Sequence, residues 1–253
     1  MRTITAQKSE RDRLDAVLVK RGLVPSRQRA QAFIMEGRVW VDGKRVEKPG
    51  ARVGADAEVE IKGKEYPYVS RGGAKLEKAL THWDIKVEGK IFLDVGVSTG
   101  GFTDCLLQKG AAKVYGVDVG YGQLAWVLQC DERVVNLERS NIRYLNGEVF
   151  EDELDGAVID VSFISLKKVI PKVVELIKRD GDIIALIKPQ FEVGKGEVGK
   201  GGVVKDTKKH EEVIDEISSF AFSLALQVIG IVESPLMGPK GNKEYLIYLK
   251  KNG

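Results

Sequence analysis

Apolar residues follow one pattern in the first quarter of the chain and a different one in the remainder. In the first quarter, apolar positions at helical spacing predict helices over 13–22 and 26–37, each closed by a glycine. A hairpin is predicted at 39–46, around the turn Asp42-Gly43, and 57–61 alternates like a further strand. This pattern predicts a small α+β domain over 1–64 and a polar linker over 65–69.

Beyond the linker, short apolar runs typical of buried strands alternate with helical stretches. Helices are predicted at 70–80, from 101, from 123, at 166–178 and at 207–226. Strands are predicted at 91–95, 113–117, 134–137, 157–160, 183–188, 228–232 and 245–249. Because helices separate most of the strands, we expect a mostly parallel sheet covered on both faces. Only a short loop joins the last two strands, which predicts antiparallel pairing there. The expected fold over 70–253 is therefore α/β and Rossmann-like, with seven strands and an antiparallel last strand.

Few residues of the metal-binding or redox types are present. The two cysteines, Cys105 and Cys130, and the two histidines, His82 and His210, show no metal-ligand spacing. No run approaches the roughly 20 apolar residues needed to cross a bilayer, and the first residues lack the apolar region of a signal peptide. We therefore expect a cytoplasmic protein with no obligatory metal and no membrane partner. The sequence does not give an oligomeric state.

Positive charge is concentrated at the front of the chain. Residues 1–52 contain 13 Lys and Arg against 6 Asp and Glu, a surplus of seven, whereas the whole chain carries only +3. A basic first domain on a mildly acidic body favours contact with nucleic acid. A solvated basic face without a partner is the alternative.

The stretch Leu93-Asp94-Val95-Gly96-Val97-Ser98-Thr99-Gly100-Gly101-Phe102 predicts a buried strand, a tight turn and the start of a helix. Glycines allow a ligand to approach the backbone closely, and the leading carboxylate of Asp94 suits a cationic ligand better than a pyrophosphate. Asp118 ends the next strand, 24 residues after Asp94, where an acid can hold a ribose diol. This turn resembles the S-adenosylmethionine site of class I methyltransferases. An ordinary strand-turn-helix unit without a cofactor is the alternative.

Three ionisable residues fall at strand ends on the predicted ligand-binding edge of the sheet. They are Asp160, Lys188 and Glu244. Each by itself could be a solvated strand end or a member of an ion pair, because a charge at the end of an apolar strand is costly unless it is paired.

The first domain resembles the S4 RNA-binding domain. The family pattern S-R-x-x-A-x-x-x-I-x-x-G-x-V-x-V-x-G is matched from Ser26 to Gly43. In that family the basic edge of the second helix contacts structured RNA. The resemblance therefore implies phosphate contacts for Arg27, Arg29, Arg38, Lys44 and Arg45.

Nearly the whole chain resembles the TlyA (haemolysin A) family of ribosomal RNA methyltransferases. The motifs that carry the resemblance are S-R-G-G-A-K-L, D-V-G-x-S-T-G-G-F-T, D-V-G-Y-G-Q-L-A-W, D-V-S-F-I-S, K-P-Q-F-E-V-G-K-G and G-N-K-E-Y. The order Lys75, Asp160, Lys188, Glu244 resembles the K-D-K-E tetrad of FtsJ-like ribose 2′-O-methyltransferases. The resemblance implies that these four residues are catalytic.

The tetrad suits proton removal from a ribose 2′-hydroxyl during attack on a sulfonium methyl group. A lysine can act as the base only when neutral, and a neighbouring cation favours its neutral form while carboxylates orient it. We assign Lys188 as the base, Lys75 as the neighbouring cation, and Asp160 and Glu244 as orienting acids.

The resemblance implies S-adenosylmethionine as the cofactor. Its methionine and ribose portions are expected on the turn residues Asp94, Gly96, Ser98, Thr99, Gly100 and Gly101, with Asp118 on the ribose hydroxyls. Asn141 is a candidate for the adenine edge, although an asparagine that caps a turn is an equal alternative.

The implied function is 2′-O-methylation of ribosomal RNA within ribosomal subunits, on a cytidine of 23S rRNA and, in one subgroup, also of 16S rRNA. The chain ends at Gly253, directly after the last predicted strand, which favours the large subunit alone. One rival is a non-catalytic RNA-binding assembly factor, against which the complete tetrad argues. Another is a membrane-active haemolysin, for which the sequence shows no strongly amphipathic cationic helix.

Overall fold

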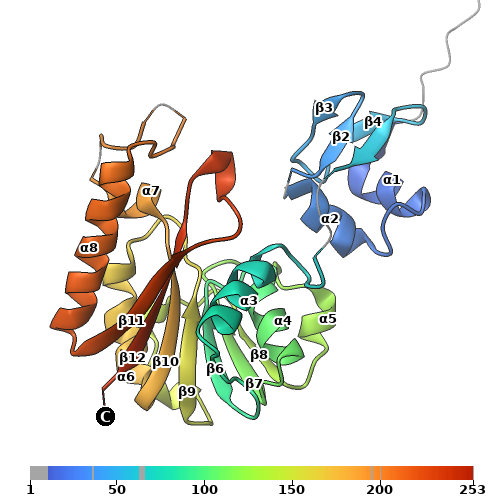
Figure 1. The fold of residues 1–253 in the computed structure, drawn as a ribbon. Helices are drawn as coiled ribbons and strands as arrows, with labels where there is room; N and C mark the ends of the chain where they lie inside the picture. The colour runs from blue at the N-terminus through green and yellow to red at the C-terminus, as the bar shows by residue number, and fades with distance from the viewer. Residues whose placement is uncertain (1–10, 36, 63–65, 195, 200, 253) are drawn as a thin grey trace, which may run out of the picture. The chain divides into compact units, whose positions relative to one another are not determined.

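The computed structural model describes residues 11–35, 37–62, 66–194, 196–199 and 201–252. The chain folds into two compact units, the first ending at Val69 and the second beginning at Ser70 (Figure 1). Each unit has its own hydrophobic core. No helix among these residues combines the length and the apolar character that crossing a bilayer demands.

The first unit packs two helices against short strands. Its elements are α1 (Leu14–Lys20), α2 (Arg27–Met35), a sheet of β3 (Lys44–Arg45), β2 (Val39–Val41) and β5 (Val59–Ile61), and the pair β1 (Arg11–Arg13) with β4 (Arg52–Gly54). Ser26 Oγ accepts a hydrogen bond from the Arg29 backbone at 3.2 Å, as a residue preceding α2 should. Asp42 and Gly43 have φ of 48° and 72°, the conformation that the predicted hairpin turn requires.

The second unit is built on a seven-stranded sheet with the order β11-β12-β10-β9-β6-β7-β8. Its strands are β6 (Ile91–Val95), β7 (Lys113–Val117), β8 (Val134–Leu137), β9 (Leu154–Ile159), β10 (Ile177–Ile187), β11 (Leu226–Glu233) and β12 (Tyr245–Lys251). β12 lies between β10 and β11 and is antiparallel to both, whereas the other neighbouring pairs are parallel. The mostly parallel α/β fold with an antiparallel last strand is confirmed.

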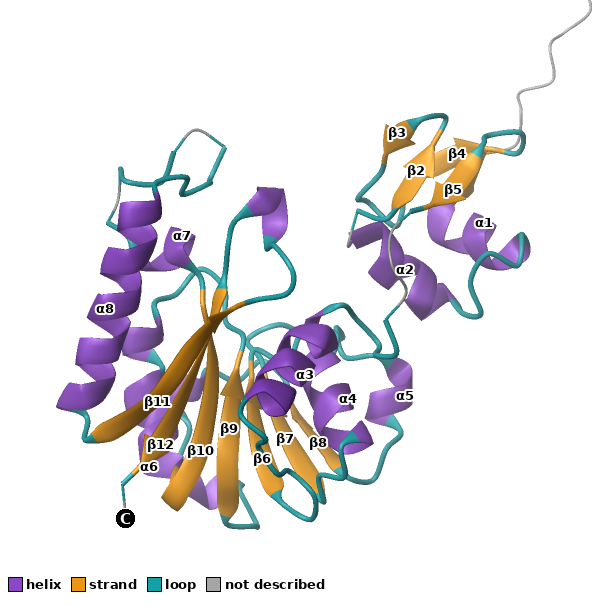
Figure 2. Ribbon diagram, in the orientation of Figure 1, coloured by secondary structure: helices purple, strands orange, loops and turns teal. Residues whose placement is uncertain are grey.

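Helices cover both faces of this sheet (Figure 2). The helices of this unit are α3 (Gly72–His82), α4 (Gly101–Gln108), α5 (Trp126–Gln129), α6 (Ile170–Leu176), α7 (Pro189–Glu192) and α8 (Thr207–Ser223), with short 3₁₀ helices η1 (Ile142–Tyr144), η2 (Gly147–Val149), η3 (Leu166–Lys168) and η4 (Pro239–Gly241). Alternate strand residues such as Leu93 and Ile183 pack with Val173 of α6 and Ile217 of α8 in one core cluster. Since strand side chains alternate, their neighbours face the opposite helices.

Several helices are shorter than predicted. The helix expected over 207–226 ends at Ser223, and Leu226 instead begins β11. The helix expected over 166–178 is divided into η3 and α6, because Pro171 lacks a backbone N–H and is accommodated only in the first turn of a helix. Its last two predicted residues, Ile177 and Lys178, instead begin β10. The helix expected from Gln123 begins at Trp126 and lasts one turn.

Candidate active site

Four ionisable side chains from four separate elements meet at the carboxyl edge of the sheet. They are Lys75 on α3, Asp160 after β9, Lys188 after β10 and Glu244 before β12. Strand order explains the meeting, because β10 lies between β9 and β12. The sheet therefore brings the chain segments near residues 160, 188 and 244 to one corner.

The four side chains form two ion pairs. Lys75 Nζ donates to Glu244 Oε2 at 2.6 Å, and Lys188 Nζ lies 2.6 Å from Asp160 Oδ1. Lys188 also donates to Ser162 Oγ at 3.0 Å. Both lysines and Glu244 are buried. Such charges are tolerated in the interior because each has a partner of opposite sign.

The two ion pairs act on one another. Burial of Asp160 raises its pKa, but the positive charges of Lys188 and Lys75 outweigh burial and hold that pKa below the ordinary value. Since lysines from both pairs influence the same carboxylate, the four residues behave as one electrostatic cluster. Such clusters are frequent at sites of proton transfer.

One carboxylate oxygen of Glu244 has no hydrogen-bond partner among the described residues. The carboxylate is 1% exposed, and its Oε1 accepts no hydrogen bond from the described residues. Gly238 stands against this oxygen, because a Cβ at position 238 would lie 2.1 Å from it. A buried acceptor of this kind is suited to a hydroxyl group.

The glycine-rich turn follows β6, on the same edge of the sheet. Gly96 and Gly100 have φ of 87° and 92°, and Ser98 has φ of 48°. The Asp118 carboxylate secures the turn, since its Oδ2 accepts from the Ser98 backbone at 2.8 Å and its Oδ1 from the Gly120 backbone at 2.7 Å. The backbone carbonyl of Thr99 accepts from Ala125 at 3.2 Å. The turn is thus held in a strained shape that only glycines adopt readily.

Asp94 is a buried carboxyl group beside this turn. It is buried, its Oδ2 accepts from Thr103 Oγ1 at 2.7 Å, and its Oδ1 accepts no hydrogen bond from the described residues. Burial, reinforced by the negative charges of Asp160 and Asp118, raises the pKa of Asp94 to about 7. An unpartnered acceptor here fits a cationic ligand such as the α-ammonium group or the sulfonium of S-adenosylmethionine.

Gly101 and Asn141, which are also predicted to bind the cofactor, have structural roles, as Asp118 does. Gly101 begins α4 against α3, where a Cβ would lie 2.3 Å from Ser70 Oγ. Asn141 caps η1, since its Oδ1 accepts from the backbone and side chain of Arg143 at 3.2 and 3.3 Å. In this structure Asn141 therefore makes the contacts of a capping residue, which was the alternative to binding the adenine edge.

In the first unit, several of the predicted phosphate-binding arginines make contacts within the chain. Arg29 donates to the backbone carbonyls of Tyr68 and Tyr66 at 2.7 and 3.2 Å. Arg27 lies 3.1 Å from Asp15, whose burial would raise its pKa but whose hydrogen bonds from Arg13, Gln31 and Arg27 hold it well below the usual range. These two arginines therefore stabilise the fold of the first unit as well as contributing to its positive charge.

The remaining three predicted RNA contacts lie near the β2–β3 hairpin. Arg38 stacks on the Phe33 ring at 3.8 Å and donates to the Lys62 carbonyl at 3.3 Å. Arg45 pairs with Glu47 at 2.6 Å, and Lys44 is exposed at the hairpin turn.

Two residues beside the tetrad were not singled out from the sequence. Ser162 contacts Lys188, and Phe163 is 90% exposed with φ of 63°, its ring 5.0 Å from that of Phe191. A bulky residue in the left-handed region is uncommon and marks functional sites. Both residues lie in the motif D-V-S-F-I-S, which also contains Asp160, and this position in the sequence could have indicated that they lie near the site.

Two family models match the chain. The model of the FtsJ-like methyltransferases matches residues 68–251, and the model of the S4 domain matches residues 12–59.

Proteins similar over most of the chain are known. A Mycobacterium tuberculosis protein named 16S/23S rRNA (cytidine-2'-O)-methyltransferase TlyA is 47% identical over 243 residues, which are 96% of this chain and 91% of that protein. A Campylobacter jejuni protein named 23S rRNA (cytidine-2'-O)-methyltransferase TlyA is 36% identical over 186 residues, 73% of this chain and 72% of the relative.

Solved structures share the fold. One titled "Putative hemolysin from Streptococcus thermophilus" has a TM-score of 0.76 and 42% identity, and covers 96% of this chain and 89% of its own. The magnesium protoporphyrin IX methyltransferase of Synechocystis, at 14% identity and a TM-score of 0.51 over 76% of this chain and 90% of its own, shares the fold alone.

Proposed function

Because this chain belongs to the TlyA family of proteins with an S4 domain and an FtsJ-like methyltransferase domain, we propose that it methylates a ribose 2′-oxygen of ribosomal RNA. The methyl donor is S-adenosylmethionine and the target nucleotide is a cytidine. The observation that carries this proposal is the junction of the Lys75–Glu244 and Lys188–Asp160 ion pairs on the edge of the sheet that also carries the glycine-rich turn.

The residues on this edge suit the cofactor. When bound, S-adenosylmethionine supplies an electrophilic methyl group on a positively charged sulfur. Asp94, whose buried Oδ1 has no hydrogen-bond partner among the described residues, would face a cationic part of the molecule. Asp118 would accept from ribose hydroxyls while it secures the turn. The remaining candidates for cofactor binding are Gly96, Ser98, Thr99, Gly100, Gly101 and Asn141.

The tetrad acts on the hydroxyl group of the substrate. In its neutral form, after its ammonium has given up a proton to solvent, Lys188 Nζ takes the proton from the 2′-hydroxyl as the hydroxyl oxygen attacks the methyl group. Asp160 and Ser162 fix the direction of the amine. Glu244 Oε1, which is buried and has no hydrogen-bond partner among the described residues, would accept the same hydroxyl before transfer, while Lys75 holds the carboxylate in place. The proton thus moves from oxygen to nitrogen within a group of charges that is already arranged.

The first unit is the proposed RNA-binding part of the chain. We propose that the exposed side chains of Arg27, Lys44 and Arg45 contact phosphates, together with Arg29 and Arg38 where their contacts within the chain allow. Since ribosomes are the target, the proposed site of action is the cytoplasm.

The test is transfer of labelled methyl groups from S-adenosylmethionine to purified 50S and 30S subunits, with the product mapped by 2′-O-methyl-sensitive primer extension. Label at a cytidine ribose supports the proposal. The chain is similar to one relative named for 23S rRNA alone and to another named for both 16S and 23S rRNA. Both ribosomal subunits are therefore tested as substrates. Cofactor binding without label on either subunit would support the non-catalytic assembly factor instead.

Cofactor affinity is expected to rise with pH through about 7. Below this pH the Asp94 carboxyl is neutral, since its pKa is raised to about 7, and a cationic ligand must displace the proton. Affinity should fall by up to about tenfold per pH unit well below 7 and level off above about 8. Isothermal titration calorimetry in buffers of different ionisation enthalpy measures both the affinity and the proton released. A wild-type profile as flat as that of Asp94→Asn would contradict the assignment.

The substitution Phe163→Ala is expected to weaken RNA binding and leave cofactor binding unchanged. An aromatic ring that is 90% exposed beside the tetrad can stack on an unstacked base, which is worth about 1–3 kcal/mol. The KM for RNA should therefore rise roughly 5- to 150-fold. Phe222→Ala on α8, 80% exposed, is the matched control and should change nothing. Equal effects of the two substitutions would refute a stacking role.

A further inference from the structure

The loop Ser234–Lys243 encloses the carboxylate of Glu244. The Ser234 backbone donates to the Glu244 carbonyl at 2.9 Å, which closes the base of the loop. Gly238, near its middle, faces Glu244 Oε1 with no room for a side chain. The shape of this loop therefore determines where the carboxylate lies.

Asn242 connects this loop to a second segment of the chain. Its side chain is buried, and its Nδ2 donates to the carbonyls of Pro239 and Gly202 at 3.1 and 2.9 Å. Its Oδ1 accepts from the Val204 backbone at 3.1 Å. One amide thus fixes the turn of its own loop and joins that loop to residues 202–204.

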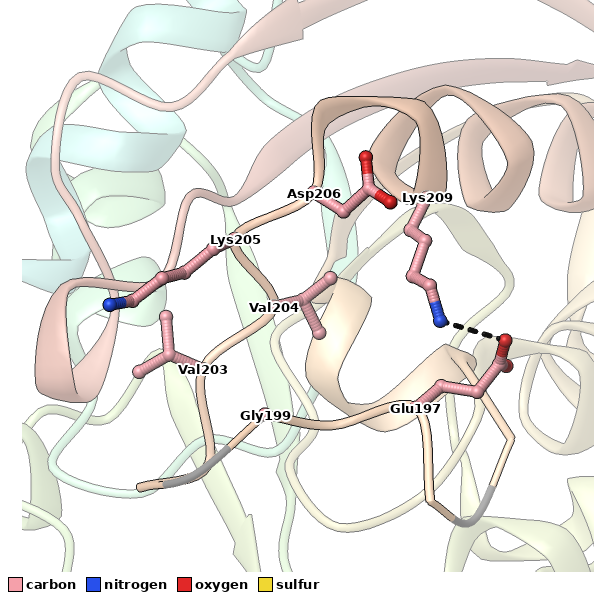
Figure 3. Close-up of a pocket in the computed structure, with 7 residues that line it drawn as sticks. All are labelled: Glu197, Gly199, Val203, Val204, Lys205, Asp206 and Lys209. Carbon is pink, nitrogen blue, oxygen red and sulfur yellow. Dashed lines mark hydrogen bonds and ion pairs between the residues drawn. The ribbon is translucent and has the colours of Figure 1, made fainter.

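Val204 is also held from the other side. His210 on α8 donates from Nε2 to the Val204 carbonyl at 2.8 Å, and its Nδ1 lies 2.9 Å from the hydroxyl of Tyr245. The Val204 side chain lines a pocket of about 300 Å³ beneath the start of α8, together with Glu197 and Lys209, which pair at 2.9 Å (Figure 3).

These bonds form a closed ring that runs through the catalytic segment. The ring passes from Val204 through Asn242, along the backbone to Tyr245, and through His210 back to Val204. Glu244 lies in the sequence between Asn242 and Tyr245, which are both members of the ring. The ring therefore fixes the backbone on both sides of Glu244.

We propose that Asn242, His210 and Tyr245 are positioning residues that hold Glu244 in register with Lys75 through their shared attachment to Val204. They act on Glu244 and do not contact the reacting atoms. This inference rests on the proposed function, because it assigns Glu244 a part in methyl transfer. A displaced carboxylate should slow the chemical step and leave the binding of cofactor and RNA intact.

Single-turnover methyl transfer tests the inference. Asn242→Ala should lower the rate about 10- to 100-fold and Tyr245→Phe about 3- to 10-fold, with KM for RNA and cofactor affinity unchanged. In a Glu244→Gln background, Asn242→Ala should have almost no further effect, within about twofold. A general structural defect would lower the rate equally in both backgrounds, and this result would overturn the proposal.

Matched controls are available in the same unit. Tyr248→Phe removes a hydroxyl from the same strand, where it donates to Asp182 at 2.7 Å, and Asn146→Ala removes an exposed asparagine that caps η2. Both should transfer methyl groups at the wild-type rate.

Hydrogen–deuterium exchange tests the ring without catalysis. Asn242→Ala should speed exchange at the amides of Val204 and Ser234 and in residues 234–244, whereas Tyr248→Phe should leave these unchanged. Unchanged protection in Asn242→Ala would overturn the inference whatever the activity. If Asn242→Ala loses this protection but the wild-type protein transfers no methyl group, the ring of hydrogen bonds is supported and the proposed function is refuted.

Discussion

Lys188→Met should slow methyl transfer severely while the protein still folds and binds its cofactor. Methionine nearly preserves the length of the side chain and removes the amine that takes the proton from the 2′-hydroxyl. Loss of a general base typically costs about 10²- to 10⁴-fold in rate. In this variant the positive charge of Lys75 still acts on the Asp160 carboxylate, so the negative charge of that buried carboxylate remains partly balanced. Single-turnover transfer and calorimetric cofactor binding measure the two effects separately.

Lys178→Met is the matched control. Lys178 lies near the other end of β10 and pairs with Asp155, so the substitution also removes a lysine from an ion pair with an aspartate on β9. It should change stability slightly and transfer not at all. Near-wild-type transfer by Lys188→Met would exclude Lys188 as the base and leave Lys75 as the candidate.

Gly96→Ala should destabilise the second unit and displace Asp160. Gly96 has φ of 87°, and a Cβ there would lie 2.6 Å from the backbone oxygen of Asp160. The left-handed backbone alone costs an L residue roughly 1–2 kcal/mol, and the collision adds to it, so a loss of about 2–4 kcal/mol is expected. Transfer should fall at least about 10²-fold, because the collision acts on a tetrad residue.

Gly122→Ala separates the two contributions. Gly122 has φ of 63° and nothing within 4 Å of its ideal Cβ, so alanine there meets backbone strain without a collision. Chemical denaturation should show a loss of only about 1–2 kcal/mol, and transfer should persist below the unfolding midpoint. Equal losses in both variants would mean that the contact between Gly96 and Asp160 has no consequence.

Local patterns in the sequence predicted most of the fold. The largely apolar stretch at 91–95, interrupted only by Asp94, indicated a buried strand, and Asp42-Gly43 indicated a two-residue hairpin turn; both are present. The pairing of β1 with β4 was not predicted, because Arg11-Asp12-Arg13 is charged, exposed and without alternation. The start of β10 at Ile177 was missed because its register with β9 shifts between Ile177 and Asp182.

For the candidate site, the residue types were readable but their partners were not. The order of Lys75, Asp160, Lys188 and Glu244 in the chain cannot reveal that Lys75 pairs with Glu244, 169 residues away. That pairing depends on the antiparallel register of β12 on β10, which is a tertiary feature. The burial of Asp94 among other carboxylates, which shifts its pKa, is equally non-local.

The close approach of Gly238 to Glu244 has an evolutionary consequence. Gly238 has φ of −68°, which any amino acid can adopt, so only the carboxylate oxygen 2.1 Å from an ideal Cβ excludes a side chain there. Selection for glycine at this position should therefore depend on the presence of the acid. In lineages that kept this architecture but lost Glu244, position 238 would be released and would accumulate larger residues. Glycine at 238 should therefore accompany the acid at 244 in proteins that keep this loop.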